Sequence, residues 1–344
     1  MTKVQLLGYG SKAPSGVLDN KKLESLFDTS AEWIETNVGI KERRILGKDE
    51  SIVTIGEDAA REAIENALPR IAIEQKQTRT AEQVLEKIRF IICGTNSPPE
   101  LYPSTAVKIQ ERLGLKECFS YDLQAGCSGW LAGISAARGY FQNLKDDEYV
   151  LVVGSDSLSS KFDYHDRAAI LYGDGAGAAL LGKSSGVSQI IDVDMRSVYS
   201  DSLALQTPYS PEFNNPDMYE KGGRPTPVMM HPQSKSKSVL KLSIEKFQEN
   251  IEHILARNNM KKSDIQYFIP HQTNIRAIQK FCEILEFPFE KVPITLVERG
   301  CISTAGLPTH MCKLQKTSPI QPGDIVLFWT FGAGFTYGSM IAKY

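Results

Sequence analysis

The sequence has no uninterrupted apolar run of about 18 residues, the length that a helix needs to cross a membrane. Its first ten residues, Met1 to Gly10, also lack the apolar core of a secretory signal peptide. The formal net charge is only −2, so no excess of one sign draws the chain to nucleic acid or to an anionic membrane. We therefore expect a cytoplasmic protein that binds neither nucleic acid nor a membrane.

Disulfide and zinc patterns are missing as well. The six cysteines form no Cys-x-x-Cys pair, and no cysteine stands at zinc-ligand spacing from a histidine. This distribution predicts reduced thiols and no bound metal. The cysteines are Cys93, Cys118, Cys127, Cys282, Cys301 and Cys312.

Short apolar runs alternate along the chain with longer stretches of helical periodicity, which is typical of βαβ units, so we predict an α/β fold. The predicted strands cover residues 90–94, 149–154, 178–182, 189–193, 267–270 and 325–330. The predicted helices cover residues 55–68, 105–113 and 238–258. Residues 200–237 contain six prolines and are predicted to be irregular, either as a cover over a substrate tunnel or as a plain surface excursion.

Cys127 stands in the segment Tyr121-Asp-Leu-Gln-Ala-Gly-Cys127-Ser-Gly-Trp130, directly before a small, apolar helical run at 131–140. A thiol at a helix N-terminus faces unpaired backbone N–H groups and the positive end of the helix dipole, and both favour the thiolate. A thiolate in this place can attack a carbonyl carbon. For an isolated cysteine, the alternative is a small buried hydrophobe.

A second candidate follows the predicted strand at 267–270. That strand leads into His271, in Phe268-Ile-Pro-His271-Gln-Thr-Asn274, and a histidine at a strand end is well placed to act as a general base. We expect Asn274 to support this turn, and we keep it among the candidates for substrate binding.

Six ordered motifs resemble those of β-ketoacyl-acyl-carrier-protein synthase III, a condensing enzyme of the thiolase superfamily. They are Asp28-Thr-Ser-Ala-Glu-Trp33-Ile-Glu-Thr-Asn-Val-Gly-Ile-Lys-Glu-Arg43, the Cys127 segment, Arg167, Tyr172-Gly-Asp-Gly-Ala-Gly-Ala178, the His271 segment and Phe331-Gly-Ala-Gly-Phe-Thr-Tyr-Gly338. The resemblance covers almost the whole chain. It implies the thiolase fold, in which two similar βαβαβαβαβ halves pack as a five-layered αβαβα sandwich.

We place the division between these halves at the segment Ser184-Ser-Gly-Val. The N-terminal half, residues 1–185, then carries the nucleophilic Cys127, and the C-terminal half, residues 186–344, carries His271. The resemblance also implies a homodimer with a continuous central sheet. It implies a thioester of coenzyme A or of an acyl carrier protein as the substrate, and no cofactor.

The same resemblance assigns the acyl-enzyme to Cys127 and proton handling to His271. In the family, the oxyanion is held by the N–H of the cysteine and by an N–H of a glycine-rich turn near the C-terminus. The matching turn here is Gly332-Ala333-Gly334, with Ala333 where the family usually has glycine. A backbone donor is available from either residue, so Ala333 is the second oxyanion candidate.

Cys301 is the main departure from the family. Relatives place an asparagine in a Gly-Asn-Thr-Ser-like turn, where it acts with the histidine on the enolate that forms when a malonyl thioester loses CO₂. Alignment on Pro308 puts Cys301 at the asparagine position. A thiol is a weaker donor than an amide N–H, and removal of one such donor typically costs roughly 10²–10³ in rate.

Three functions remain open on this basis. The favoured one is a specialised synthase that condenses acyl thioesters with an already activated partner, such as a β-keto thioester, in secondary metabolism. The second is an O- or N-acyltransferase of the same fold. The third is a weakly catalytic subunit of a heteromeric synthase, and the retention of both Cys127 and His271 argues against it.

Glu100 and Tyr102 lie in the segment Ser97-Pro-Pro-Glu100-Leu-Tyr102-Pro. This segment resembles the family loop that crosses the dimer interface and puts an aromatic residue, here Tyr102, into the neighbour's acyl pocket. Relatives that join two acyl chains without decarboxylation use a glutamate of this loop as the base at the α-carbon, which makes Glu100 a candidate base. A solvated loop carboxylate is the alternative.

Trp33 and Arg167 match family positions that pack around the adenine of coenzyme A, since an aromatic plane and a cation both suit a flat base. The alternative for Trp33 is ordinary core packing. Asn37 stands where bacterial synthases commonly have an arginine that meets the phosphate of the coenzyme. The absence of this arginine weakens the case for free coenzyme A as the acyl donor, so an acyl carrier protein is an alternative donor.

Overall fold

The computed structural model describes residues 2–162, 164, 167–199, 236–318 and 320–344. The proline-rich segment at 200–237 lies almost wholly outside the described residues, so its predicted irregularity stays a prediction. No helix within the described ranges is long and apolar enough to span a bilayer.

The first sheet has five strands, in the order β1-β7-β6-β4-β5. β4 runs parallel to β5 and β6, whereas β7 pairs antiparallel with both β1 and β6. Every residue of β6 is buried, which explains its almost continuous apolar sequence. The strands are β1 (Val4–Lys12), β4 (Ile88–Gly94), β5 (Phe119–Leu123), β6 (Tyr149–Ser157) and β7 (Asp174–Lys183).

The second sheet has four strands, in the order β8-β11-β10-β9. β9 and β10 are parallel, while β11 pairs antiparallel with both β10 and β8. The strands are β8 (Gln189–Ser197), β9 (Tyr267–Pro270), β10 (Ile325–Gly332) and β11 (Thr336–Lys343). All six predicted strands are present in these two sheets, which also contain the unpredicted strands β1, β5 and β11.

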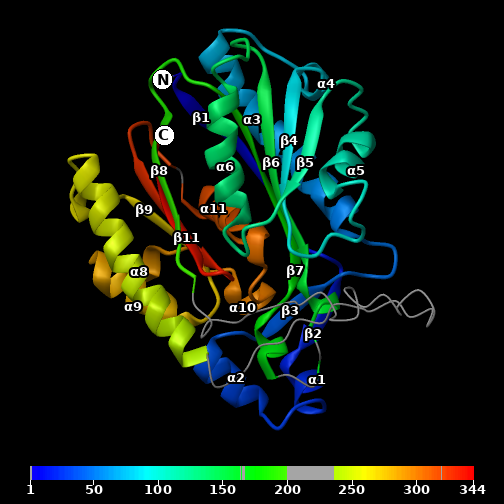
Figure 1. Cartoon of the computed structure of the whole chain (residues 1–344), viewed down its shortest axis with the longest axis vertical. Coiled ribbons are helices and arrows are strands. Elements are labelled where there is room, and N and C mark those ends of the chain that lie inside the picture. The colour runs from blue at the N-terminus through cyan, green and yellow to red at the C-terminus, as the bar shows by residue number, and fades with distance from the viewer. Residues whose placement is uncertain (1, 163, 165–166, 200–235, 319) are drawn as a thin grey trace.

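Helices form three layers around the two sheets (Figure 1). α3 (Ile52–Gln75) and α5 (Thr105–Arg112) cover the outer face of the first sheet, and α8 (Ser236–Arg257) and α9 (Ile275–Leu285) cover that of the second. α6 (Gly129–Tyr140) and α11 (Gly306–Thr317) lie between the sheets. The α/β prediction and its five-layered sandwich are confirmed.

The central layer is dense because α6 is apolar on most of its surface. Trp130, Leu131 and Ile134 are each at most 1% exposed and pack among side chains of both sheets. Burial of each such side chain contributes roughly 1.5–3 kcal/mol. The start of α6, and with it Cys127, is therefore held firmly between the two halves of the fold.

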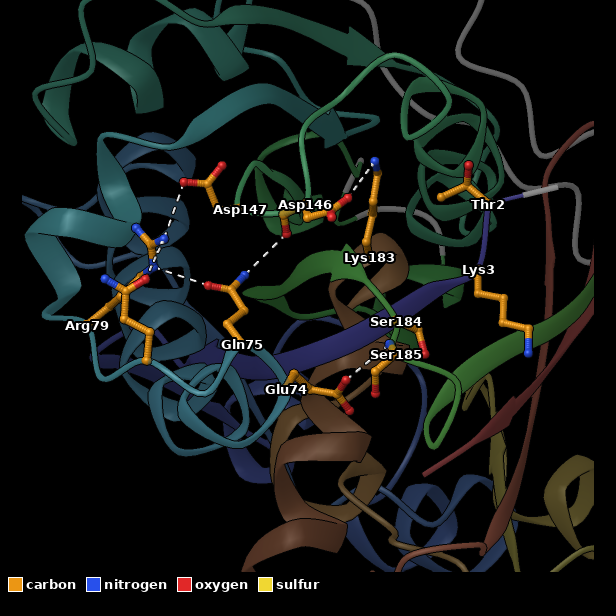
Figure 2. A pocket seen from close by; sticks show the side chains of 11 residues that line it. Thr2, Lys3, Glu74, Gln75, Arg79, Asp146, Asp147, Lys183, Ser184 and Ser185 are labelled. Atoms are coloured by element: carbon orange, nitrogen blue, oxygen red, sulfur yellow. Dashed lines mark hydrogen bonds and ion pairs between the residues drawn. The ribbon is translucent and has the colours of Figure 1, made fainter.

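The connection between the sheets lies at residues 184–188, since β7 ends at Lys183 and β8 begins at Gln189. The predicted division falls inside this connection and stays a prediction. An open hollow of about 560 Å³ lies here, and Figure 2 shows two ion pairs among the side chains that line it, Arg79–Asp147 and Lys183–Asp146.

Smaller elements close the lower end of the molecule in Figure 1. They include the two-stranded antiparallel sheet of β2 and β3, which the buried Arg43 anchors through a hydrogen bond from its Nε to the Ile170 carbonyl, 2.7 Å away. These elements, with α4 near the top, are β2 (Gly16–Asp19), α1 (Asn20–Glu24), α2 (Ala31–Val38), β3 (Glu42–Ile45), α4 (Ala81–Leu85) and α10 (Leu296–Arg299).

Candidate active site

Cys127 lies in a tight turn between β5 and α6, two residues before the helix begins at Gly129. Gly126, which precedes it, has a left-handed φ of +57°, a conformation that suits glycine. A Cβ on Gly332 would stand only 2.4 Å from the Cys127 amide nitrogen. The nucleophile turn and the glycine-rich turn after β10 are therefore in backbone contact, and this contact requires glycine.

Two threonines fasten the nucleophile turn to the β10–β11 hairpin. The Thr330 hydroxyl donates to the Cys127 carbonyl at 3.4 Å, and the Thr336 hydroxyl donates to the Ala125 carbonyl at 2.8 Å. Since the turn comes from the first sheet and the hairpin from the second, these bonds fix the position of Cys127 across the two halves.

The glycine-rich turn brings the Ala333 amide next to the turn that carries Cys127. A Cβ on Gly126 would stand 2.6 Å from the Ala333 amide nitrogen, so this amide lies beside the backbone of the nucleophile turn. The Cys127 and Ala333 amides are thus neighbours. That arrangement suits two donors to one oxyanion.

His271 follows β9 and is 2% exposed. Its backbone N–H donates to the Trp329 carbonyl at 2.7 Å, which extends the pairing of β9 with β10 by one residue. Its side-chain Nε2 lies 3.8 Å from the Cys301 sulfur. The histidine therefore reaches the site from the end of a rigid strand.

Cys301 is fully buried, and both its backbone N–H and its backbone carbonyl form hydrogen bonds. Its N–H donates to the Leu171 carbonyl at 2.8 Å, and its carbonyl accepts from the Gly173 N–H at 3.0 Å. The Cys127 and Cys301 sulfurs and a His271 ring nitrogen all lie within 4.8 Å of one another. The structure thus brings together the three residues that the sequence singled out.

The pKa values of the two thiols are shifted in opposite directions. A hydrogen bond from Cys301 lowers the pKa of Cys127 well below the usual thiol value; His271 and Ser303 add to this effect, and burial opposes it. The same hydrogen bond and burial raise the pKa of Cys301 well above its usual value. These opposite shifts favour the thiolate at Cys127 and the thiol at Cys301.

Ser303 is a site residue that the sequence did not indicate. Its hydroxyl donates to the Cys127 sulfur at 3.4 Å, and it accepts from the Asn96 side-chain amide at 3.1 Å. Asn96 in turn donates to Asp156, a fully buried carboxylate that also accepts from Thr304. Ser303 has a φ of +50°, an uncommon conformation for serine that this network maintains.

The candidates from the loop between β4 and α5 lie apart from this trio within the chain. Glu100 forms an ion pair with Lys108 of α5, and its side chain is 48% exposed. Tyr102 is 84% exposed. Their proposed roles concern the active site of a partner subunit.

Two of the candidates for substrate binding, Trp33 and Asn274, lie at α2. Trp33 is 42% exposed, so the core-packing alternative for it is wrong. Asn274 caps α9 by accepting from the Arg276 N–H at 2.8 Å, and its side-chain amide donates to the Asn37 carbonyl at 3.2 Å. The guanidinium of Arg276 also donates to the Asn37 side chain at 2.8 Å, which puts a cation beside the position where the family arginine is missing.

Arg167 begins a short 3₁₀ segment, Arg167–Leu171, and its side chain lies outside the described part of the structure. Its role at the adenine stays a prediction. All six cysteines are free thiols, as expected. The trio of Cys127, His271 and Cys301 is close enough to share a metal ion, but a low-pKa thiolate at a helix start suits a nucleophile, and we keep the prediction of no metal.

A low-pKa cysteine, a buried histidine and two converging backbone amides, set between the halves of a five-layered sandwich, define a cysteine-dependent acyltransferase of the thiolase fold. Models of 3-oxoacyl-[acyl-carrier-protein] synthase III match residues 121–198, and its C-terminal part matches residues 255–344. The chain belongs to the β-ketoacyl-[acyl-carrier-protein] synthase III family, whose members are condensing enzymes.

Individual relatives agree with this assignment. A β-ketoacyl-[acyl-carrier-protein] synthase III of Sodalis glossinidius is 35% identical over 344 residues, which is 99% of each chain. The crystal structure of the synthase III from Aquifex aeolicus VF5 has a TM-score of 0.84 at 30% identity, covering 99% of this chain and 100% of that one. The priming β-ketosynthase of the R1128 polyketide pathway has a TM-score of 0.83 at 26% identity, and the match covers 99% of this chain and 96% of that one.

Proposed function

We propose that this chain joins acyl thioesters by a Claisen-type condensation through a Cys127 acyl-enzyme, with an already activated partner such as a β-keto thioester of secondary metabolism. The observation that carries the proposal is Cys301, whose sulfur lies 3.8 Å from His271 Nε2 at the position of the family asparagine. The site keeps the machinery for acyl transfer but has a weak donor for decarboxylation.

The first half-reaction is thioester exchange. The Cys127 thiolate attacks the carbonyl carbon of an acyl-CoA or acyl-carrier-protein thioester, and the Cys127 and Ala333 amides stabilise the oxyanion. When the tetrahedral intermediate collapses, the carbon–sulfur bond to the carrier breaks. The departing thiolate takes a proton from His271, which leaves an acyl group on Cys127 and a neutral histidine.

The second half-reaction decides the product. The neutral His271, or Glu100 as the candidate base, takes an α-proton from the second thioester. The resulting carbanion attacks the acyl-enzyme carbonyl, and the carbon–sulfur bond to Cys127 breaks to release its thiolate. A β-keto thioester loses an α-proton more readily than a simple thioester because its enolate spreads over two carbonyls. Such a partner needs no loss of CO₂, so a weak donor at residue 301 limits it less than it limits a malonyl thioester. The likeness to a priming β-ketosynthase of a polyketide pathway supports a role in secondary metabolism.

An O- or N-acyltransferase is the second candidate. It would use the same acyl-enzyme, and an alcohol or amine would replace the carbon nucleophile. The weak donor at Cys301 is compatible with it, since an alcohol or amine forms no enolate. A structural subunit of a heteromeric synthase is disfavoured by the low pKa of Cys127 beside a buried His271.

We also propose that the active form is a homodimer. β5 is the edge strand of the first sheet, so it presents unpaired backbone groups to a second copy. Phe119 on this strand is 63% exposed, and Leu101 and Tyr102 nearby are 66% and 84% exposed. Sedimentation should show a dimer for the native chain and a monomer for Phe119→Asp, and a monomeric native chain that still condenses thioesters would contradict the proposal.

The function is tested by loading the enzyme with acetyl-CoA or a longer acyl-CoA and following the intact protein by mass spectrometry. One acyl adduct is expected, and it should be absent from Cys127→Ala. The loaded enzyme is then offered malonyl and β-ketoacyl thioesters, alcohols and amines. A new carbon–carbon product from the β-keto partner supports the proposal, whereas an ester or amide establishes the acyltransferase alternative.

A further inference from the structure

His310 is a buried histidine that neither the motifs nor the proposed reaction uses. It lies on α11, is 2% exposed, and its Nδ1 is 2.9 Å from the Thr295 hydroxyl oxygen. Its other ring nitrogen, Nε2, has no hydrogen-bond partner among the described residues, and the same holds for Nδ1 of His271. Two buried histidines therefore each have one unsatisfied nitrogen, and such groups normally find a partner.

Gly306 places these two nitrogens together. A Cβ on Gly306 would stand 3.3 Å from His310 Nε2 and 3.6 Å from His271 Nδ1. Both nitrogens thus lie within 3.6 Å of one point beside the Gly306 Cα. They make no direct hydrogen bond to each other, and one bridging water, which buried polar groups commonly share, would satisfy both.

Thr295 is fixed in place by the residue that follows His271. The Gln272 side-chain oxygen accepts from the Thr295 N–H at 3.0 Å and from the Leu296 N–H at 3.1 Å. The Gln272 side-chain amide donates to the Pro293 carbonyl at 2.9 Å. The turn that carries His271 therefore also holds the hydroxyl that contacts His310.

The charge state of His310 follows from its surroundings. Burial lowers the pKa of His310 well below the usual value, and the charges of His271, Arg299 and Lys313 lower it further. A neutral imidazole has one N–H donor and one acceptor nitrogen. His271 faces the Cys127 thiolate and the Cys301 thiol on its other side, and as an imidazolium beside a thiolate it would have an N–H on each nitrogen.

We propose that His310 is a positioning residue for His271: its Nδ1–H donates to Thr295, and its Nε2 accepts a hydrogen bond from one water that in turn accepts from His271 Nδ1–H. This bridge fixes the His271 ring with Nε2 toward the two thiols, and it stabilises the imidazolium after Nε2 has taken a proton. The inference rests on the proposed role of His271 in acyl transfer.

The direct test is ¹⁵N NMR of the histidine rings in the intact, unloaded protein. His271 should carry its proton on Nδ1 when neutral, and His310 should stay neutral with a protonated Nδ1. In His310→Ala, the His271 tautomer should become mixed. A His271 that is protonated on Nε2 in the native protein, or a tautomer that His310→Ala leaves unchanged, would overturn the inference.

A second readout follows the reaction of Cys127 with iodoacetamide across the pH range, using the mass of the Cys127 peptide. With a less stable imidazolium, His310→Ala should shift the inflection to higher pH by at least about one unit, the size expected for a hydrogen bond to a charged group. Thr295→Val, which keeps the shape and removes the hydroxyl, should give a smaller shift in the same direction. His310→Gln should partly restore the native profile, because its amide oxygen can accept.

Thermal unfolding of each variant separates loss of positioning from loss of the fold. A His310→Ala protein that unfolds at the native temperature but keeps the native alkylation profile would contradict the inference. The outcome is independent of the condensation assay: a native enzyme that forms no carbon–carbon product while its alkylation depends on His310 would refute the proposed function and leave this inference standing.

Discussion

The Ser303 hydroxyl donates a hydrogen bond to the Cys127 sulfur over 3.4 Å, although 176 positions separate the two residues in the chain. Ser303 reaches the sulfur because its backbone adopts a φ of +50° and because Asn96 and Asp156 hold its oxygen from the other side. A buried carboxylate is thereby connected to the Cys127 sulfur through two neutral groups. The hydrogen bond from Ser303 lowers the pKa of Cys127 without placing a positive charge beside the sulfur.

Removal of the Ser303 hydroxyl should raise the pKa of Cys127. A hydrogen bond to a charged group contributes about 1.5–3 kcal/mol, so in Ser303→Ala the inflection of the pH profile for alkylation of Cys127 should move upward by about 1–2 pH units. Alanine also has to adopt the left-handed φ, so Ser303→Gly serves as the control that removes the hydroxyl without that strain. Equal shifts in both variants would assign the effect to the hydrogen bond, and a native inflection in Ser303→Gly would refute it.

The pH dependence of Cys127 follows from the direction of its pKa. Because Cys301 and His271 hold the pKa of Cys127 below the usual thiol value of about 8.5, the thiolate is already formed at neutral pH, and its reactivity is lost only as the pH falls through the lowered pKa. Alkylation by iodoacetamide should therefore be nearly constant between about pH 7 and pH 9. In Cys301→Ala the inflection should move to higher pH. An ordinary thiol titration curve in the native protein would contradict this prediction.

The strands that the sequence predicted are those that contain a short, largely apolar run, such as residues 149–154 of β6. β1 escaped prediction because it contains Gly8 and Gly10, which weaken a strand pattern. Their role is tertiary: a Cβ on Gly8 would stand 2.4 Å from the Ala63 carbonyl oxygen, and one on Gly10 would stand 2.0 Å from that of Ala59. The backbone of α3 at Ala59 and Ala63 packs directly against these two glycines. A sequence pattern within β1 alone cannot predict this contact with a distant helix.

The same limit applies to the site. Cys127, His271 and Cys301 could be found because each stands in a local motif. Ser303 and His310 carry no such signal, since their importance comes from a φ angle and from a partner on another element. Thr336 is similar, because its hydrogen bond to Ala125 joins segments 211 positions apart. A pattern within one segment predicts a reactive group, but not the groups that a distant segment places around it.

Cys301→Asn should restore a strong amide donor next to His271. Since one such donor is worth roughly 10²–10³ in rate, decarboxylation of a malonyl thioester should rise by about that factor. Cys301→Ala, which offers no donor, is the matched control and should stay at the native level or below. Release of CO₂ from malonyl-CoA is the measurement, and an unchanged rate in a folded Cys301→Asn protein would count against the positional match.

Glu100→Gln tests the proposed base at the α-carbon. Because Glu100 lies on an exposed loop and its described contact is the ion pair with Lys108, its catalytic role requires that the loop enter the site of a partner subunit. The variant should keep the acyl adduct on Cys127 and lose the condensation product, since glutamine cannot accept the α-proton. Lys108→Gln breaks the same ion pair but keeps the carboxylate, so it should retain condensation. Equal loss in both variants would assign the effect to loop structure, and unaltered product formation by Glu100→Gln would discard the base.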